Sequence, residues 1–150
     1  MQANELIKAT GSVTIVKKNE VTGVEEVIYY PNLVTSVGKT WIAQRLKDTT
    51  IPPQANNMAI GSSSTAAAVG DTILGTESSR QLLTTAGGTG AANVITYQAT
   101  FAAGQGTGNV YEAGLFNNTT GGTLICHTVF GLVTKGAADS LAITWTLTIS

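Results

Sequence analysis

Charged side chains are scarce in this chain. Asp, Glu, Lys and Arg make up 11% of its 150 residues, against about 25% in an average soluble domain. The net charge is −1, and Lys17-Lys18 is the only pair of adjacent basic residues. Because no stretch of the sequence could neutralise a run of phosphates, nucleic acid is not an expected partner.

Cysteine and histidine occur once each, as Cys126 and His127. A single cysteine excludes an internal disulfide and a cysteine-based zinc site. The two residues are neighbours in a predicted strand, where successive side chains point to opposite faces, so we do not expect a Cys–His pair. Each is interpreted as a packed or edge side chain. An enzyme is an alternative class, but one His and scattered carboxylates predict no catalytic residue and no metal site.

Two glycine-containing motifs predict no cofactor and no small-molecule substrate. Gly38-Lys39-Thr40 would need a glycine five residues before Gly38 to form a phosphate-binding loop, and Leu33 stands there. The glycines of 104–108 lie between two predicted strands, whereas a dinucleotide fingerprint opens a helix. We interpret that segment as a turn.

Long apolar runs are also missing. No run approaches the roughly 18–20 residues that span a bilayer. The start, Met1 to Glu5, lacks the basic and then apolar layout of a secretory signal. We therefore expect no membrane association, and synthesis in the cytoplasm.

Apolar residues, at 43%, together with Thr and Ser take the place of the missing charges. Thr is β-branched and fits a half-buried pleated sheet better than a helix. Side chains of this kind cost little to desolvate, as suits the core of an interface. Composition leaves two interpretations open: a surface that is buried in an assembly, or a soluble domain with a Thr-rich face.

Alternation and turn residues predict a mostly β fold, an antiparallel β-sandwich that is either jelly-roll-like or immunoglobulin-like. A less regular α+β layer is the alternative. We divide the chain into an N-terminal arm over residues 1–10 and a single domain over 11–150. One short helix is expected over 37–47, with Ser36 as its N-cap. The predicted strands are 11–17, 24–30, 57–61, 77–84, 94–101, 110–116, 124–133 and 141–150.

The last strand alternates without exception between apolar and small residues. Its register is therefore well specified, because a slip of one residue would turn every apolar side chain outward. We assign to the core Trp41, Leu141, Ile143, Trp145, Leu147 and Ile149.

Glu112 lies inside predicted strand 110–116, where a half-buried carboxylate needs a cationic partner. The chain has two arginines, Arg45 and Arg80, and only arginine offers a bidentate fork. We predict a structural salt bridge between Glu112 and Arg80, with a solvated edge glutamate as the alternative. The stretch 62–75, rich in Ser, Ala and Gly, is predicted to be an irregular but ordered loop.

Several short motifs occur in a fixed order from Asn32 to Ser150. They are Asn32-Leu33-Val34-Thr35 before the helix, Met58-Ala59-Ile60-Gly61, Gly70-Asp71-Thr72, Leu74-Gly75-Thr76-Glu77 with Arg80, Glu112-Ala113-Gly114-Leu115-Phe116-Asn117, Gly121-Gly122-Thr123 and Thr144-Trp145-Thr146-Leu147. In this combination the chain resembles a group of small virion structural proteins of tailed bacteriophages. The resemblance implies a non-enzymatic protein of the capsid, as cement or decoration, or of the tail, baseplate or fibre.

The capsid location is favoured by two features. The chain has no heptads or fibrous repeats of the kind that build shafts, and a compact domain with a short arm suits a clamp across shell subunits. The leading hypothesis is a capsid cement or decoration protein, made in the host bacterial cytoplasm and built into the virion. Its expected partners are the major capsid protein or other virion proteins and copies of itself as a homo-oligomer. The arm 1–10 and the loop 62–75 are the candidate contacts, and a tail, baseplate or fibre module that touches the host is the alternative.

Overall fold

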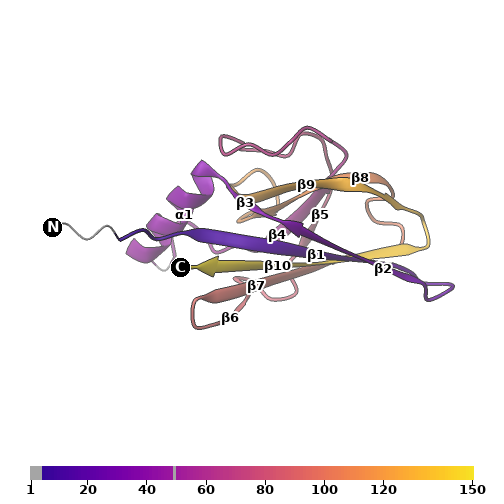
Figure 1. Ribbon diagram of the computed structural model, residues 1–150, viewed down its shortest axis with the longest axis horizontal. Helices are drawn as coiled ribbons and strands as arrows, with labels where there is room; N and C mark the ends of the chain where they lie inside the picture. The colour runs from indigo at the N-terminus through magenta and orange to yellow at the C-terminus, as the bar shows by residue number, and fades with distance from the viewer. Residues whose placement is uncertain (1–4, 49) are drawn as a thin grey trace.

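The computed structural model describes residues 5–48 and 50–150 and is an antiparallel β-sandwich with one short helix (Figure 1). Its elements are β1 (Ala9–Asn19), β2 (Glu25–Pro31), β3 (Leu33–Val34), α1 (Ser36–Lys47), β4 (Asn57–Gly61), β5 (Glu77–Leu82), β6 (Thr89–Ala91), β7 (Val94–Phe101), β8 (Gly108–Phe116), β9 (Leu124–Lys135) and β10 (Asp139–Ile149). Sheet A has the strand order β2-β1-β10-β7-β6, and sheet B has the order β3-β9-β8-β4-β5. The predicted mostly β sandwich is confirmed.

The main core lies between the two sheets, and β10 is central to it. Leu141, Ile143, Trp145 and Leu147 are at most 1% exposed, so each contributes roughly 1.5–3 kcal/mol of hydrophobic stabilisation. β10 pairs with β1 on one side and β7 on the other. The alternation of the last strand thus fixes the centre of sheet A.

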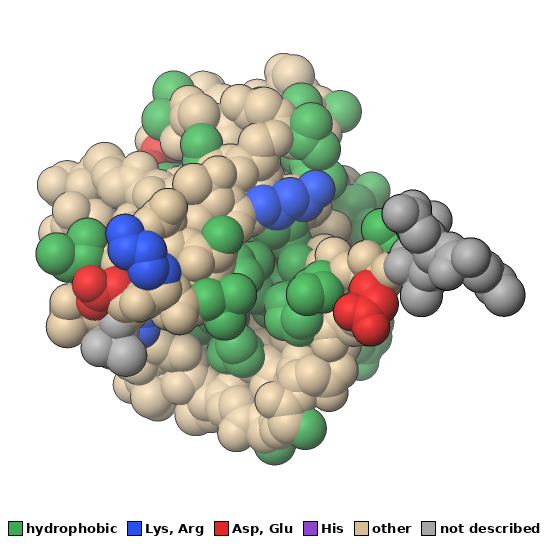
Figure 2. Space-filling view, turned by 90° about the vertical axis from the view of Figure 1, so that its left-hand side faces the viewer, with side chains coloured by type: hydrophobic (Ala, Val, Ile, Leu, Met, Phe, Trp, Pro, Cys, Tyr) green, Lys and Arg blue, Asp and Glu red, His purple; other side chains and the backbone are tan. Residues whose placement is uncertain are grey.

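One end of the sandwich is closed incompletely. Trp41 of α1 is buried there, but Ile149 is only half-buried, because it lies at the end of β10 where the sheet stops. The two residues line an apolar hollow of about 360 Å³ together with Ile42, Leu46 and Leu147. Figure 2 looks onto this end and shows hydrophobic side chains in the hollow, with charged side chains around it.

The N-terminal arm is shorter than predicted. β1 begins at Ala9, and Ala9 and Thr10 pair with Ile149 and Thr148 of β10. Lys8 and Ser150 exchange two backbone hydrogen bonds, of 2.6 and 2.8 Å. These small or polar residues carry little apolar periodicity, which is why the sequence did not predict the extension. Residues 1–4 of the predicted arm lie outside the described residues.

Helix α1 begins as predicted within one residue, but Thr35 and not Ser36 is its N-cap. The Thr35 hydroxyl accepts a hydrogen bond from the Gly38 amide at 2.9 Å and donates to the Leu124 carbonyl at 2.6 Å. Gly38 allows the helix to lie against β9, because a Cβ there would collide with the Ile125 carbonyl. Among the described residues, no helix is both long enough and apolar enough to cross a membrane.

Two short strand segments were not predicted. Thr89 and Gly90 belong to β6, and Gly108, the last residue of the predicted turn 104–108, begins β8. Both segments pair with a neighbouring strand, β7 and β9 respectively. Backbone pairing holds these glycine-containing segments in the sheets although their side chains carry no apolar pattern.

Candidate functional site

The loop 62–76, which joins β4 to β5, has no helix or strand of its own. It runs above β8 and β9 in Figure 1. Its Leu74 packs with Ala59, Phe116 and Leu124 in a small second core on the outside of sheet B. The loop therefore covers a part of sheet B that would otherwise be exposed.

Glu112 of β8 holds both ends of this loop. Its side chain is fully buried, and its carboxylate accepts backbone hydrogen bonds from Ser63 at 3.3 Å, Gly75 at 2.9 Å and Thr76 at 2.8 Å. Gly61 makes this approach possible, since a Cβ there would lie 2.5 Å from the Glu112 carboxylate. One buried carboxylate thus accepts the backbone hydrogen bonds that a helix or strand would otherwise satisfy within the loop.

His127 of β9 links this carboxylate to the middle of the loop. Its Nε2 lies 2.9 Å from Glu112 Oε2, and its Nδ1 lies 2.8 Å from Asp71 Oδ2. Asp71 in turn accepts a hydrogen bond from the Ala68 amide at 2.8 Å. The three side chains form one chain of contacts, Glu112–His127–Asp71, that we call the loop tie.

The loop tie favours the charged forms of Glu112 and His127. Both neighbours of the imidazole are acceptors, and only the imidazolium can donate from both ring nitrogens. Burial lowers the pKa of His127, but its hydrogen bonds to the Glu112 and Asp71 carboxylates outweigh this effect, so this pKa lies above its ordinary value of 6.5. Burial raises the pKa of Glu112, but hydrogen bonds from His127 and the loop amides outweigh it, so this pKa lies below 4.5.

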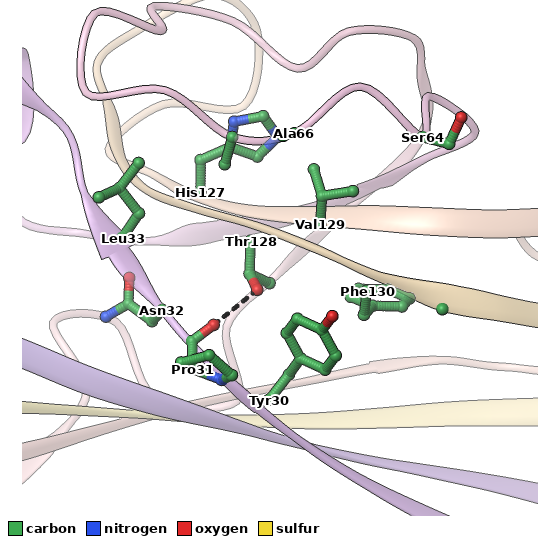
Figure 3. A pocket seen from close by; sticks show the side chains of 12 residues that line it. Tyr30, Pro31, Asn32, Leu33, Ser64, Ala66, His127, Thr128, Val129 and Phe130 are labelled. Carbon is green, nitrogen blue, oxygen red and sulfur yellow. Dashed lines mark hydrogen bonds between the residues drawn. The ribbon is translucent and has the colours of Figure 1, made fainter.

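The surroundings of His127 contain two open hollows. One, of about 500 Å³, lies between the corner at Tyr30 to Leu33 and strand β9 (Figure 3). The other, of about 300 Å³, lies within the loop beside Asp71. His127 borders both hollows, but each of its ring nitrogens is already held by a carboxylate. In 5–48 and 50–150, no group of three or more His, Cys, Asp and Glu side chains is placed to hold a metal ion.

Cys126 faces the other way from His127, as expected for neighbours in a strand. It is completely buried in the main core between the sheets. Burial raises the pKa of its thiol to about 12. The thiol is therefore a packed apolar group and remains protonated at neutral pH.

The predicted salt bridge between Glu112 and Arg80 is wrong. Arg80 binds Glu77 through two hydrogen bonds, of 2.9 and 2.7 Å, and its guanidinium lies 3.7 Å from the centre of the Phe116 ring. It also donates to the carbonyls of Asn118 and Gly121, both at 2.9 Å. The physical reason is the strand order: β4 lies between β5, which carries Arg80, and β8, which carries Glu112.

The sequence contained a signal for the real partner of Glu112. β8 and β9 form a hairpin, and His127 is opposite Gly114 in its register. Residues two apart in a strand share a face, so Glu112 and His127 are diagonal neighbours. The hairpin register thus predicts the contact once both residues are considered together.

The outer face of sheet A is nearly free of charge. Successive side chains of each strand point to opposite faces of the sheet. The residues paired with Thr10, Ser12, Thr14 and Val16 of β1 therefore also point away from the core. From Thr10 to Val16 along β1, every residue on this face is uncharged. The face consists of Thr10, Ser12, Thr14, Val16, Val27, Tyr29, Val94, Thr96, Gln98, Thr100, Ala142, Thr144, Thr146 and Thr148. Charged residues begin at one end of this face, where Lys18 of β1 is paired with Glu25 of β2.

Comparisons of the chain with protein-family models, with curated proteins and with solved structures found no match.

Proposed function

We propose that this chain is a non-enzymatic structural protein of a tailed-phage particle, and that it stabilises the capsid as a cement or decoration protein. The observation that carries the proposal is the uncharged outer face of sheet A. Covering such a face removes methyl and hydroxyl groups from water, which costs much less than desolvating ions. The face is therefore suited to lie against neighbouring shell subunits, and the motifs from Asn32 to Ser150 support the same class of protein.

The loop 62–76 supplies the second contact surface of this proposal. It exposes Val69 and Ile73, at 53% and 73%, while the loop tie fixes its two ends and its middle. A segment that is already ordered loses less conformational entropy when it binds. A loop held in this way can therefore add apolar contact area to a shell at a reduced entropic cost.

The proposed contact role of the loop 62–76 also assigns a role to His127, Glu112 and Asp71. Their contacts hold the loop, so their role in the proposal is to position the contact surface and not to act on a substrate. The partners of the chain in this proposal are the major capsid protein or other virion proteins.

The proposal is tested on particles of a phage whose genome encodes this chain. Cryo-electron microscopy is expected to show the β-sandwich on the capsid lattice. Particles that lack the chain are expected to release DNA at a lower temperature, measured with an intercalating dye, and added chain is expected to restore the original value. Density at the tail alone would replace the cement proposal with the tail alternative, and absence from the particle would refute both.

The role of the sheet face is tested in the same assay. Thr144→Lys places a charge in the middle of the outer face of sheet A, and it is expected to abolish the restoration. Thr120→Lys, in the exposed turn between β8 and β9, is the matched control and should restore the particle like the natural chain. Equal restoration by both variants would show that this face is not the contact.

A further inference from the structure

Strand β2 is one of the two edge strands of sheet A, and it is the most exposed of the long strands. Its residues are exposed except for Ile28, which is half-buried against the core. β2 forms a hairpin with β1. Five large apolar side chains in β2 and in the turn before it are exposed: Val21, Val24, Val27, Tyr29 and Tyr30. Such a strand edge, with apolar side chains and unpaired backbone groups, is a template for pairing with another strand.

The backbone groups that face outward from β2 follow from its pairing with β1. The Asn32 amide donates to the Gly11 carbonyl, and the Asn19 amide donates to the Val24 carbonyl. Hydrogen-bonded positions alternate along an antiparallel pair, so the even-numbered residues of β2 bond to β1. The amide and carbonyl groups of Glu25, Val27 and Tyr29 therefore point away from the sheet.

We propose that two copies of this chain pair through the edges of their β2 strands, antiparallel and centred on Ile28. In this register Val27 of each copy is opposite Tyr29 of the other, and these are the positions whose backbone groups point outward. Each of the two pairs exchanges two hydrogen bonds. Val27 and Tyr29 are also an aromatic and β-branched pair on the outer face, a combination that stabilises neighbouring strands.

The charges of β2 are compatible with this arrangement. Glu25 and Glu26 stand at one end of the strand, and Tyr30 and Pro31 stand at the other. Centring on Ile28 places Glu25 opposite Pro31 of the second copy and Glu26 opposite Tyr30, so no carboxylates oppose each other. Pro31 lacks an amide, but its carbonyl can still accept from Glu25 of the second copy. Centring on Glu26 would place two carboxylates in contact, which is unfavourable.

The pairing has a consequence for the outer face of sheet A. Two five-stranded sheets join edge to edge into one continuous sheet, and their uncharged faces become one larger surface. The pairing also covers the unpaired backbone of β2. It does not depend on the location of the chain in a particle, so it can be tested on the purified protein alone.

The first test is the oligomeric state of the full chain in sedimentation velocity. An interface with a Kd of about 1 μM would be mostly occupied at about 100 μM protein, so the natural chain is expected to sediment as a dimer at that concentration. Val27→Lys with Tyr29→Lys places four positive charges at the interface and is expected to give a monomer with an unchanged circular dichroism spectrum. Leu82→Lys, on the exposed edge strand of sheet B, is the matched control and should remain a dimer. A natural chain that is monomeric at this concentration would overturn the proposal, as would a double variant that stays dimeric.

The second test measures the register. In antiparallel sheets the Cα atoms of a pair without mutual hydrogen bonds lie about 4.5 Å apart, within the range of a disulfide. Ile28→Cys is therefore expected to form an intermolecular disulfide under mild oxidation, detected on a non-reducing gel. Val27→Cys is the control, because residue 27 is more exposed but faces Tyr29 of the second copy. Equal or preferential crosslinking of Val27→Cys would refute the register, and the buried Cys126 does not interfere.

Discussion

His127 Nε2 lies 2.9 Å from the Glu112 carboxylate, and the two side chains are 4% and 0% exposed. Two charged groups are thus held out of water, one on each strand of the β8–β9 hairpin. Desolvation of such a pair is expensive, and it is offset here by the amides of Ser63, Gly75 and Thr76 and by Asp71. A buried ion pair of this kind stabilises only as a complete network, and loss of one member leaves the others uncompensated.

Glu112→Gln should destabilise the protein more than any change at an exposed carboxylate. The amide nitrogen of Gln cannot accept from the loop amides, and it leaves the imidazolium without its buried counter-charge. We expect a loss of about 3 kcal/mol in the free energy of unfolding, measured by urea denaturation. Glu26→Gln, whose side chain is 59% exposed, is the control and should change stability by less than about 0.5 kcal/mol. Equal effects of the two changes would contradict the loop tie.

Stability is expected to be highest in mildly acidic solution. The raised pKa of His127 means that its contribution is complete below its unfolded value of 6.5 and is lost as the pH rises through its folded value. The lowered pKa of Glu112 means that its contribution is present above its unfolded value of 4.5 and is lost as the pH falls through its folded value. The two groups together predict a maximum between pH 4.5 and 6.5.

Melting temperatures between pH 5 and pH 8.5 test this prediction. Burial raises the pKa of both Cys126 and Tyr97 to about 12, whereas unfolded Cys and Tyr ionise near about 8.5 and about 10. The loss of stability below about pH 7.5 therefore reports His127, and the loss above it also includes Cys126. A double variant, His127→Gln with Glu112→Gln, should have a flatter profile. A melting temperature that rises from pH 6 to pH 8.5 would be the opposite of the expected result.

Gly38→Ala should destabilise the contact between α1 and β9. Alanine favours helix over glycine by about 1 kcal/mol, but its Cβ would collide with the Ile125 carbonyl. We expect the collision to dominate and to give a net loss of about 1–3 kcal/mol, measured by thermal unfolding. Thr40→Ala, on the exposed side of the same helix, is the control and should leave stability unchanged or slightly higher. A Gly38→Ala variant more stable than the natural chain would refute the close helix contact.

Arg80→Lys should weaken the outer side of sheet B although the charge is kept. Lysine cannot form the bidentate contact with Glu77 and at the same time reach the carbonyls of Asn118 and Gly121 or cover the Phe116 ring. We expect a loss of about 1 kcal/mol and faster hydrogen exchange in the turn 117–123. Lys18→Arg, the opposite exchange at the exposed end of β1, is the control, and it should leave both the stability and the hydrogen exchange of the turn unchanged. Unchanged exchange in the Arg80→Lys variant would show that these contacts do not hold the turn.

Most of the strands, and the buried face of the last strand, were predictable from residue types. The apolar residues of 141–149 recur at every second position, and this period reports the two faces of a strand directly. β4 and β7 begin and end at the predicted residues because turn-forming segments bound them on both sides. Ala9, Thr10 and β6 were missed, since backbone pairing holds them and their side chains carry no periodic signal.

The loop contacts of Glu112 and the partner of Arg80 required the tertiary structure. Alternation assigns each residue to a face, but it does not order the strands, and the order β9-β8-β4-β5 places a whole strand between Glu112 and Arg80. The loop 62–76 has no period at all, so only its hydrogen bonds to Glu112 reveal where it lies. Local periodicity therefore determines which side chains are buried, whereas contacts between distant segments depend on a strand order that no local pattern encodes.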